Sequence, residues 1–142
     1  MSADGSTVHA RKAPTWRRLW LWQTLGWLGV ATVALLSLLP LPQMGPQLPN
    51  GDKWQHLLAY ATMALYFAQW ANSPAQRLWQ ALSLLALGGL LELLQGLTSY
   101  RQMELWDLLA NASGIGVGGA LALGPAGRWL QAIDRWLPSR IT

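Results

Sequence analysis

The chain has 142 residues, of which 52% are apolar and 11% charged, with 10 tryptophans, no cysteine and a net charge of +4. This composition excludes an ordinary soluble domain, and the lack of cysteine excludes disulfides and thiolate metal sites. Nucleic acid is excluded as a partner because the basic residues are scattered along an apolar chain that has no binding motif.

The chain begins with a polar, basic stretch, and we expect residues 1–17 to be disordered. Basic residues before an apolar run also occur in secretory signal peptides. An uncleaved anchor is favoured, because the run from Leu19 to Leu39 is longer than the apolar part of a signal peptide and no small-x-small cleavage site follows it.

Four apolar runs follow this stretch. Residues 19–51 and 108–127 carry no charge, 54–76 carry only His56, and 78–100 carry only Glu92. Each run holds about 20 residues, enough to cross a hydrocarbon core of about 30 Å as a helix. We therefore predict an all-α polytopic membrane protein with four transmembrane helices, near 18–39, 54–72, 77–98 and 105–124.

The distribution of lysine and arginine predicts the orientation. Eight lie on the side of both termini, and two, Lys53 and Arg101, lie on the other side. The eight are Arg11, Lys12, Arg17, Arg18, Arg77, Arg128, Arg135 and Arg140. Both termini are therefore expected in the cytoplasm, where these residues would also contact anionic membrane lipids.

The second helix is expected to begin with a polar line. Asp52, His56 and Tyr60 are four residues apart and share one helix face, with Lys53 close beside it. The preceding segment, 40–50, contains four prolines and is expected to form a stiff extracytoplasmic crossing. Asp52 itself has a purely structural alternative, which is to cap the helix.

Glu92 lies inside the third apolar run, with Gln95 on the same helix face. A charged carboxylate in hydrocarbon costs at least about 2.5–3.5 kcal/mol, so such residues usually face the bundle and have a partner. A buried ion pair that only fixes packing is the alternative to a functional role.

The fourth helix carries Asp107, Asn111, Gly114 and Gly118 on a single face. We interpret the glycines as a close helix contact, because no strand precedes them to make a phosphate loop. A second stripe of small residues, Ala112, Gly116 and Ala120, offers a face for homo-oligomerisation. The tail, 125–142, is expected to form a short amphipathic helix on the cytoplasmic leaflet, or a further packing contact.

The polar residues of the last three helices all fall near their outer ends, which predicts a pocket open to the extracytoplasmic face. Their pattern is Asp52-Lys53-x-x-His56, Glu92-x-x-Gln95, Arg101, Asp107-x-x-x-Asn111 and Gly114-x-x-x-Gly118. This pattern resembles the VanZ-like family of small bacterial membrane proteins over residues 50–122. The resemblance implies a bacterial inner-membrane protein, with a four-helix domain at 18–124. It also implies a link to resistance against the glycopeptide teicoplanin, for which the family is named.

Two functional hypotheses follow. In the first, an enzyme acts on the head group of an envelope lipid such as a polyprenyl phosphate or cell-wall precursor. His56, Glu92 and Asp107 would be catalytic, and the phosphate or the rest of the head group would be bound by Lys53, Arg101, Gln95, Asn111, Asp52 and Tyr60. In the second, the same cluster binds a head group or docks a partner protein without catalysis.

No cofactor is expected from the sequence. A metal site formed by His56, Glu92 and Asp107 is a weaker hypothesis, because no spacing resembles a known metal motif. A channel or transporter is weaker still, since the inner halves of the helices offer no polar path.

Overall fold

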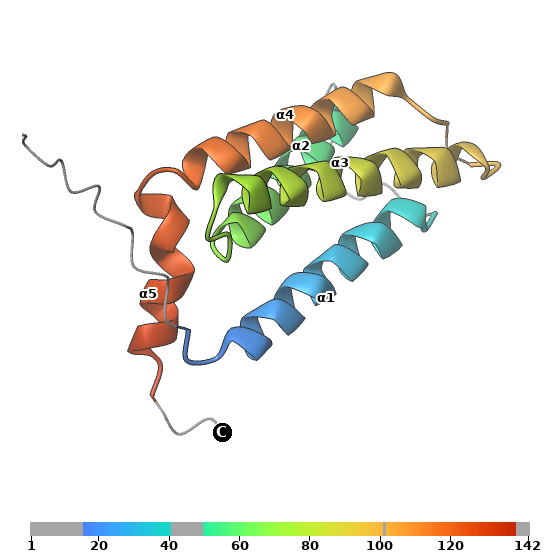
Figure 1. The fold of residues 1–142 in the computed structure, drawn as a ribbon. Helices are drawn as coiled ribbons and strands as arrows, with labels where there is room; N and C mark the ends of the chain where they lie inside the picture. The colour runs from blue at the N-terminus through green and yellow to red at the C-terminus, as the bar shows by residue number, and fades with distance from the viewer. Residues whose placement is uncertain (1–15, 41–49, 101, 139–142) are drawn as a thin grey trace, which may run out of the picture.

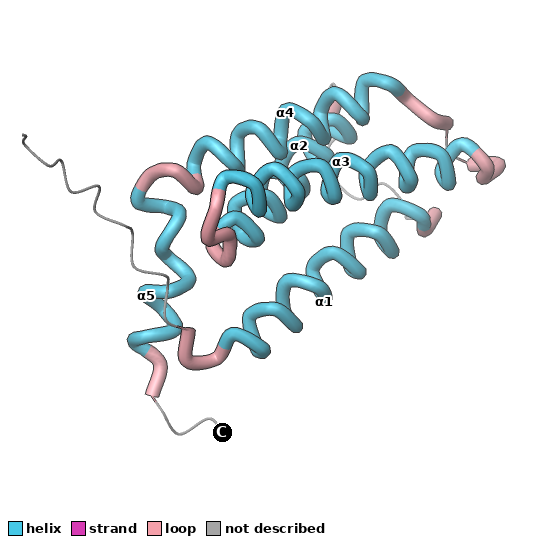
Figure 2. Tube along the Cα trace, in the orientation of Figure 1, coloured by secondary structure: helices cyan, strands magenta, loops and turns pink. Residues whose placement is uncertain are grey.

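The computed structural model describes residues 16–40, 50–100 and 102–138, and these are helical without any strand (Figures 1 and 2). The elements are α1 (Leu19–Leu38), α2 (Gly51–Ala68), α3 (Pro74–Gly96), α4 (Leu105–Leu121), the 3₁₀ turn η1 (Pro125–Arg128) and α5 (Trp129–Trp136). The predicted all-α class is confirmed. The predicted proline-rich crossing and most of the predicted disordered N-terminus lie outside the described residues.

Two helices begin three residues earlier than predicted, and local capping explains one of the shifts. Ser73 caps α3 by accepting a hydrogen bond from the backbone N–H of Gln76 at 3.2 Å, and Pro74 suits the first helical position. In α2 the cap position is occupied by Asn50, in the left-handed conformation with φ 56°. Asp52 therefore lies in the first turn, and its predicted role as the cap is wrong.

The main packing contact of the bundle joins α2 and α4 through two glycines. A Cβ added to Gly114 would collide with the backbone oxygen of Leu57, and one added to Gly118 with that of Ala61. These two helices therefore approach to backbone contact, as the glycine spacing predicted. The second stripe differs, because a Cβ added to Gly116 would meet nothing within 4 Å, so its role in oligomerisation stays a prediction.

The core is small and lies between α2, α3 and α4, centred on Tyr60, Phe67 and Leu84. The first helix packs against this group from outside, where Gly26 lets the rings of Tyr66 and Trp70 come close. Ring pairs add edge-to-face contacts, such as Phe67 with Trp70 at 5.0 Å between centroids. In the ribbon, α1 to α4 run roughly along one another and α5 crosses one end (Figure 1).

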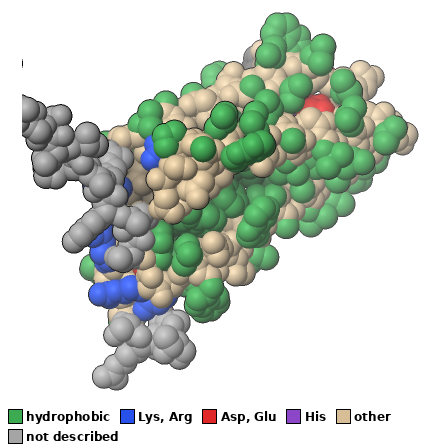
Figure 3. All heavy atoms as spheres, viewed as in Figure 1, with side chains coloured by type: hydrophobic (Ala, Val, Ile, Leu, Met, Phe, Trp, Pro, Cys, Tyr) green, Lys and Arg blue, Asp and Glu red, His purple; other side chains and the backbone are tan. Residues whose placement is uncertain are grey.

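Large apolar side chains cover much of the surface (Figure 3). Trp20 is 66% exposed, Trp79 69% and Leu97 83%. Among the described residues, α1 and α3 are long and apolar enough to cross a membrane. A third span is possible if α4 and the segment Pro125–Trp136 act together across a 79° bend. The helices thus provide two or three candidate spans, and α2, with its polar first turns, is not among them.

The end of the bundle where α5 lies is held by the buried carboxylate of Asp134. Its Oδ2 accepts the backbone N–H of Arg17 at 2.7 Å, and its Oδ1 accepts the indole N–H of Trp22 at 2.8 Å. The side chain of Arg18 donates to the Asp134 carbonyl at 3.4 Å. The tail is therefore a packing element, in which Leu130 is buried while Trp129 and Trp136 remain exposed.

Burial by itself would raise the pKa of Asp134, but the hydrogen bonds from Arg17 and Trp22 and the charge of Arg18 outweigh it and hold the pKa below its usual value. A carboxyl group with a lowered pKa stabilises the fold at any pH above its unfolded value, about 3.9. That contribution is lost as the pH falls from there through the folded-state pKa.

We predict that Asp134→Asn lowers the melting temperature in detergent at pH 7. The difference from wild type should shrink as the pH falls below about 4, because protonation then removes the same charge from the wild-type protein. Thermal melts at a series of pH values measure this. Equal melting temperatures at pH 7 would show that the contacts of Asp134 do not stabilise the fold.

The glycine contact gives a second prediction, from two alanine substitutions of opposite expected sign. Alanine favours helix over glycine by about 1 kcal/mol, so Gly116→Ala should raise or preserve the melting temperature. Gly118→Ala should lower it, because the new carbon forces α2 and α4 apart, and overpacking typically costs about 1–3 kcal/mol. Similar behaviour of the two variants in thermal melts would contradict the packing described for α4.

Candidate functional site

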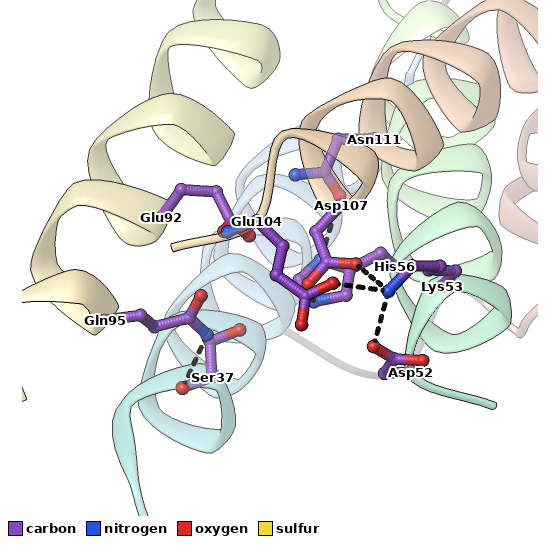
Figure 4. Close-up of polar contacts among 9 residues, drawn as sticks. All are labelled: Ser37, Asp52, Lys53, His56, Glu92, Gln95, Glu104, Asp107 and Asn111. Carbon is purple, nitrogen blue, oxygen red and sulfur yellow. Dashed lines mark hydrogen bonds and ion pairs between the residues drawn. The ribbon is translucent and has the colours of Figure 1, made fainter. Parts of the chain in front are cut away.

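Polar side chains from α2, α3 and α4 meet at the end of the bundle opposite α5 (Figures 1 and 4). The first turns of α2 and α4 lie together there, beside the last turns of α3. Because α2 and α4 are in backbone contact, residues near the starts of both helices are brought within hydrogen-bonding range. The members of this polar cluster are Asp52, Lys53, His56, Glu92, Glu104, Asp107 and Asn111.

Lys53 is surrounded by carboxylates. Its Nζ lies 2.8 Å from Asp52 Oδ2, 2.8 Å from Glu104 Oε2 and 3.2 Å from Asp107 Oδ1. The ammonium group therefore already has three anionic partners. It is not the free cation that the predicted phosphate-binding role requires.

His56 faces α4 with both ring nitrogens. Its Nδ1 lies 3.0 Å from Asn111 Oδ1, and its Nε2 lies 3.7 Å from Asp107 Oδ2. An amide oxygen can only accept a hydrogen bond, so Nδ1 carries the proton in this arrangement. In the neutral ring, Nε2 then presents a lone pair toward the acidic side chains.

Glu92 and Tyr60 are deeply buried polar side chains close to His56, at 3% and 2% exposure. One oxygen of Glu92, Oε2, accepts the backbone N–H of Glu104 at 3.3 Å. The other, Oε1, has no hydrogen-bond partner among the described residues, and neither has the Tyr60 hydroxyl. Buried polar atoms without partners are rare and point to a ligand, an ion or a bound proton.

Gln95 does not join the cluster. Its side-chain amide donates to the carbonyl of Ser37 at 2.8 Å, near the end of α1 (Figure 4). This contact ties α1 to α3 and gives Gln95 a structural role, in place of the predicted head-group contact. Arg101 lies outside the described residues.

Glu104 is a site residue that the sequence analysis does not identify. It precedes α4 and lies beside Lys53, although the two are separated by 51 residues along the chain. The one signal in the sequence that could have indicated Glu104 is its position three residues before Asp107, because residues three apart lie on the same side of a helix.

The described part of the cluster has a large excess of negative charge. The cluster holds four carboxylates, those of Asp52, Glu92, Glu104 and Asp107, and one ammonium, that of Lys53, which contacts three of them. An additional anion would be repelled by this arrangement unless a further cation accompanied it. The cluster therefore favours a cation, or a ligand that brings one.

A shallow groove of about 450 Å³ lies between α2 and α4, and Lys53 is the cluster residue among its lining side chains. Its walls are Trp54 and Leu57 of α2 and Trp106 and Ala110 of α4, and Lys53 lies at its polar end. The groove is thus mostly apolar, and both tryptophans are more than half exposed. This is a shape and chemistry suited to an amphiphile.

No protein-family model, curated protein or solved structure matches this chain. A functional proposal for the protein therefore depends on the arrangement of its own residues and on the order of its motifs.

Proposed function

We propose that this chain is a VanZ-like integral membrane protein that binds the head group of a cell-envelope lipid at the polar end of its helix bundle. The main support is the groove between α2 and α4, whose apolar walls end at Lys53. A lipid could place its chain along Trp54 and Trp106 and its head group at the cluster. A small polar metabolite would gain little from contact with these apolar side chains.

The membrane arrangement we propose has four spans. The two helices that satisfy the length and hydropathy of a span, α1 and α3, flank a core to which α2 and α4 also contribute. Helices packed within such a bundle would cross the bilayer together with it. The basic residues near α5, Arg17, Arg18 and Arg135, would then lie in the cytoplasm, and the polar cluster would face the outside of a bacterial inner membrane.

Catalysis depends on His56 in this proposal. Its Nε2 faces Asp107, and the hydrogen bond to Asn111 fixes the orientation of the ring. That arrangement supports a general base acting on a head group, with the neighbouring acids orienting it. A non-catalytic site that docks a partner protein is the second proposal, and it requires the charge and shape of the cluster without the imidazole.

The lipid that we propose is a polyprenyl phosphate or a cell-wall precursor. Phosphate could not be held by Lys53 alone, because three carboxylates already surround that side chain. Binding of such a lipid would need Arg101 or a bound cation. Teicoplanin resistance stays a prediction of the family resemblance.

Lipid retention tests the proposal directly. We expect wild-type protein, purified in mild detergent and analysed by native mass spectrometry, to carry an envelope lipid. Trp106→Ala should reduce the bound fraction about tenfold, because the substitution removes one wall of the groove. Trp79→Ala is the matched control, since Trp79 is equally exposed but does not line the groove.

Loss of lipid from both tryptophan variants would point to general lipid contact at the surface. Absence of any lipid from wild type, together with a co-purifying protein that is lost in Lys53→Gln, would favour the docking proposal instead.

Orientation can be tested by single-cysteine labelling, because the natural chain contains no cysteine. We predict that Gln102→Cys, near the polar cluster, reacts with a membrane-impermeant maleimide in intact spheroplasts. Asn72→Cys, in the turn before α3, should react only after the membrane is permeabilised. The reverse pattern would place the cluster in the cytoplasm, and labelling of both sites in intact spheroplasts would contradict four spans.

A further inference from the structure

The structure brings together the three side chains that the sequence offers as a weaker metal-site hypothesis. His56 of α2, Glu92 of α3 and Asp107 of α4 each offer one donor atom, and these atoms all lie within 4.8 Å of one another. All three side chains are at most 13% exposed. A nitrogen and two carboxylate oxygens from three different helices thus converge inside the protein.

Two of the acidic oxygens have no hydrogen-bond partner among the described residues. They are Glu92 Oε1 and Asp107 Oδ1. Asp107 Oδ1 is 3.2 Å from Lys53 Nζ, so its charge is partly balanced. Glu92 has only the weak bond from the Glu104 N–H, although the residue is just 3% exposed. A buried carboxylate in this state needs a cation or a proton.

The imidazole of His56 is oriented as a metal ligand would be. Asn111 Oδ1 accepts the hydrogen bond of Nδ1, which leaves the lone pair of Nε2 available on the side of Asp107. A second partner that fixes the tautomer and the ring is the usual arrangement around metal-bound histidine. Asn111 is itself 1% exposed, so it is held firmly.

We propose that His56, Glu92 and Asp107 bind a divalent transition-metal ion, of which zinc best suits one imidazole and two carboxylates. Donor atoms around such an ion lie about 3–3.5 Å apart, for bond lengths of about 2.0–2.2 Å. The 3.7 Å between His56 Nε2 and Asp107 Oδ2 is close to this spacing. Three coordinating side chains leave one position on the ion open for water or for an oxygen of the lipid head group.

The ion would also offset much of the negative charge of the cluster. Its two positive charges balance Glu92 and Asp107, while Lys53 remains paired with Asp52 and Glu104. A phosphate could then approach the site. The inference rests on the same site as the proposed lipid binding, and it replaces the general-base role of His56, because Nε2 cannot both bind an ion and accept a proton. Metal content and lipid retention are separate measurements, so one can fail while the other holds.

A second acidic group, Asp52, Glu104 and Asp107, is less suited to a metal ion. Its donor atoms are also within 4.8 Å of one another, but two of these residues are exposed. The ammonium of Lys53 already contacts all three carboxylates. We therefore place the ion on the His56 side of the cluster.

The test uses the full chain, purified in detergent through a tag without histidine, stripped with a chelator and dialysed into metal-free buffer. Zinc chloride alone is then added, and bound zinc is measured by mass spectrometry after gel filtration. We expect one zinc per chain and a rise in melting temperature. His56→Ala, Glu92→Gln and Asp107→Asn should each lower zinc affinity by at least about 100-fold, and Asn111→Ala by about 10- to 100-fold.

Asp134→Asn is the control, because it removes a buried acid at the opposite end of the bundle, outside the polar cluster. It should bind zinc within a factor of about three of wild type. Glu92→Gln keeps an oxygen that can accept the Glu104 N–H, so it retains the packing contact while losing the ligand charge. Gel filtration confirms that each variant is folded.

Cobalt gives an independent readout. Its visible absorption in wild type should indicate four- or five-coordination and should change in Glu92→Gln. The inference is overturned if stripped wild type binds no zinc or cobalt, or if Asp134→Asn lowers affinity as much as Glu92→Gln. A Glu92→Gln variant that is more stable than metal-free wild type, with no zinc binding in either, would show that Glu92 holds a proton.

Discussion

The backbone contact between α2 and α4 determines where the functional groups of these two helices lie. Gly114 and Gly118 have no side chains, so α4 can rest directly on the carbonyls of Leu57 and Ala61. At that distance, residues nearer the start of each helix meet across the interface. The contacts of His56 with α4 follow from this approach, and a larger residue at either glycine would separate the two halves of the polar cluster.

Charge is segregated along the bundle, and this separation is the basis of its proposed orientation. Arginines gather at the end where α5 packs, and a red patch at the opposite end marks an acidic side chain (Figure 3). Figure 4 shows the carboxylates of the polar cluster at that opposite end. The buried acidic side chains at the two ends differ in their hydrogen-bond partners. Asp134 has its oxygens hydrogen-bonded to Arg17 and Trp22 and stabilises the fold. Glu92 keeps one oxygen without a partner among the described residues, which is the arrangement expected where a ligand or ion binds.

The polar cluster joins two kinds of chemistry that seldom coexist in a membrane. Its entrance is an apolar groove beside exposed tryptophans, and its interior holds more acid than base. An amphiphile fits the apolar groove, and a divalent cation would balance the excess of acidic side chains. Together they are consistent with the site that we propose, for a lipid whose anionic head group is held through a metal ion rather than through lysine alone.

The helical class, the polar residues and the glycine face could all be predicted from the sequence, because apolar runs and four-residue spacings are local properties. No local pattern shows that Gln95 turns to Ser37, that Glu104 joins Lys53, or that Leu130 is buried beside Gln69. These pairs are 58, 51 and 61 positions apart, and only the packing of whole helices brings them together. The sequence offers His56, Glu92 and Asp107 as one site, but the distances between their donor atoms depend on tertiary structure, since each of the three comes from a different helix.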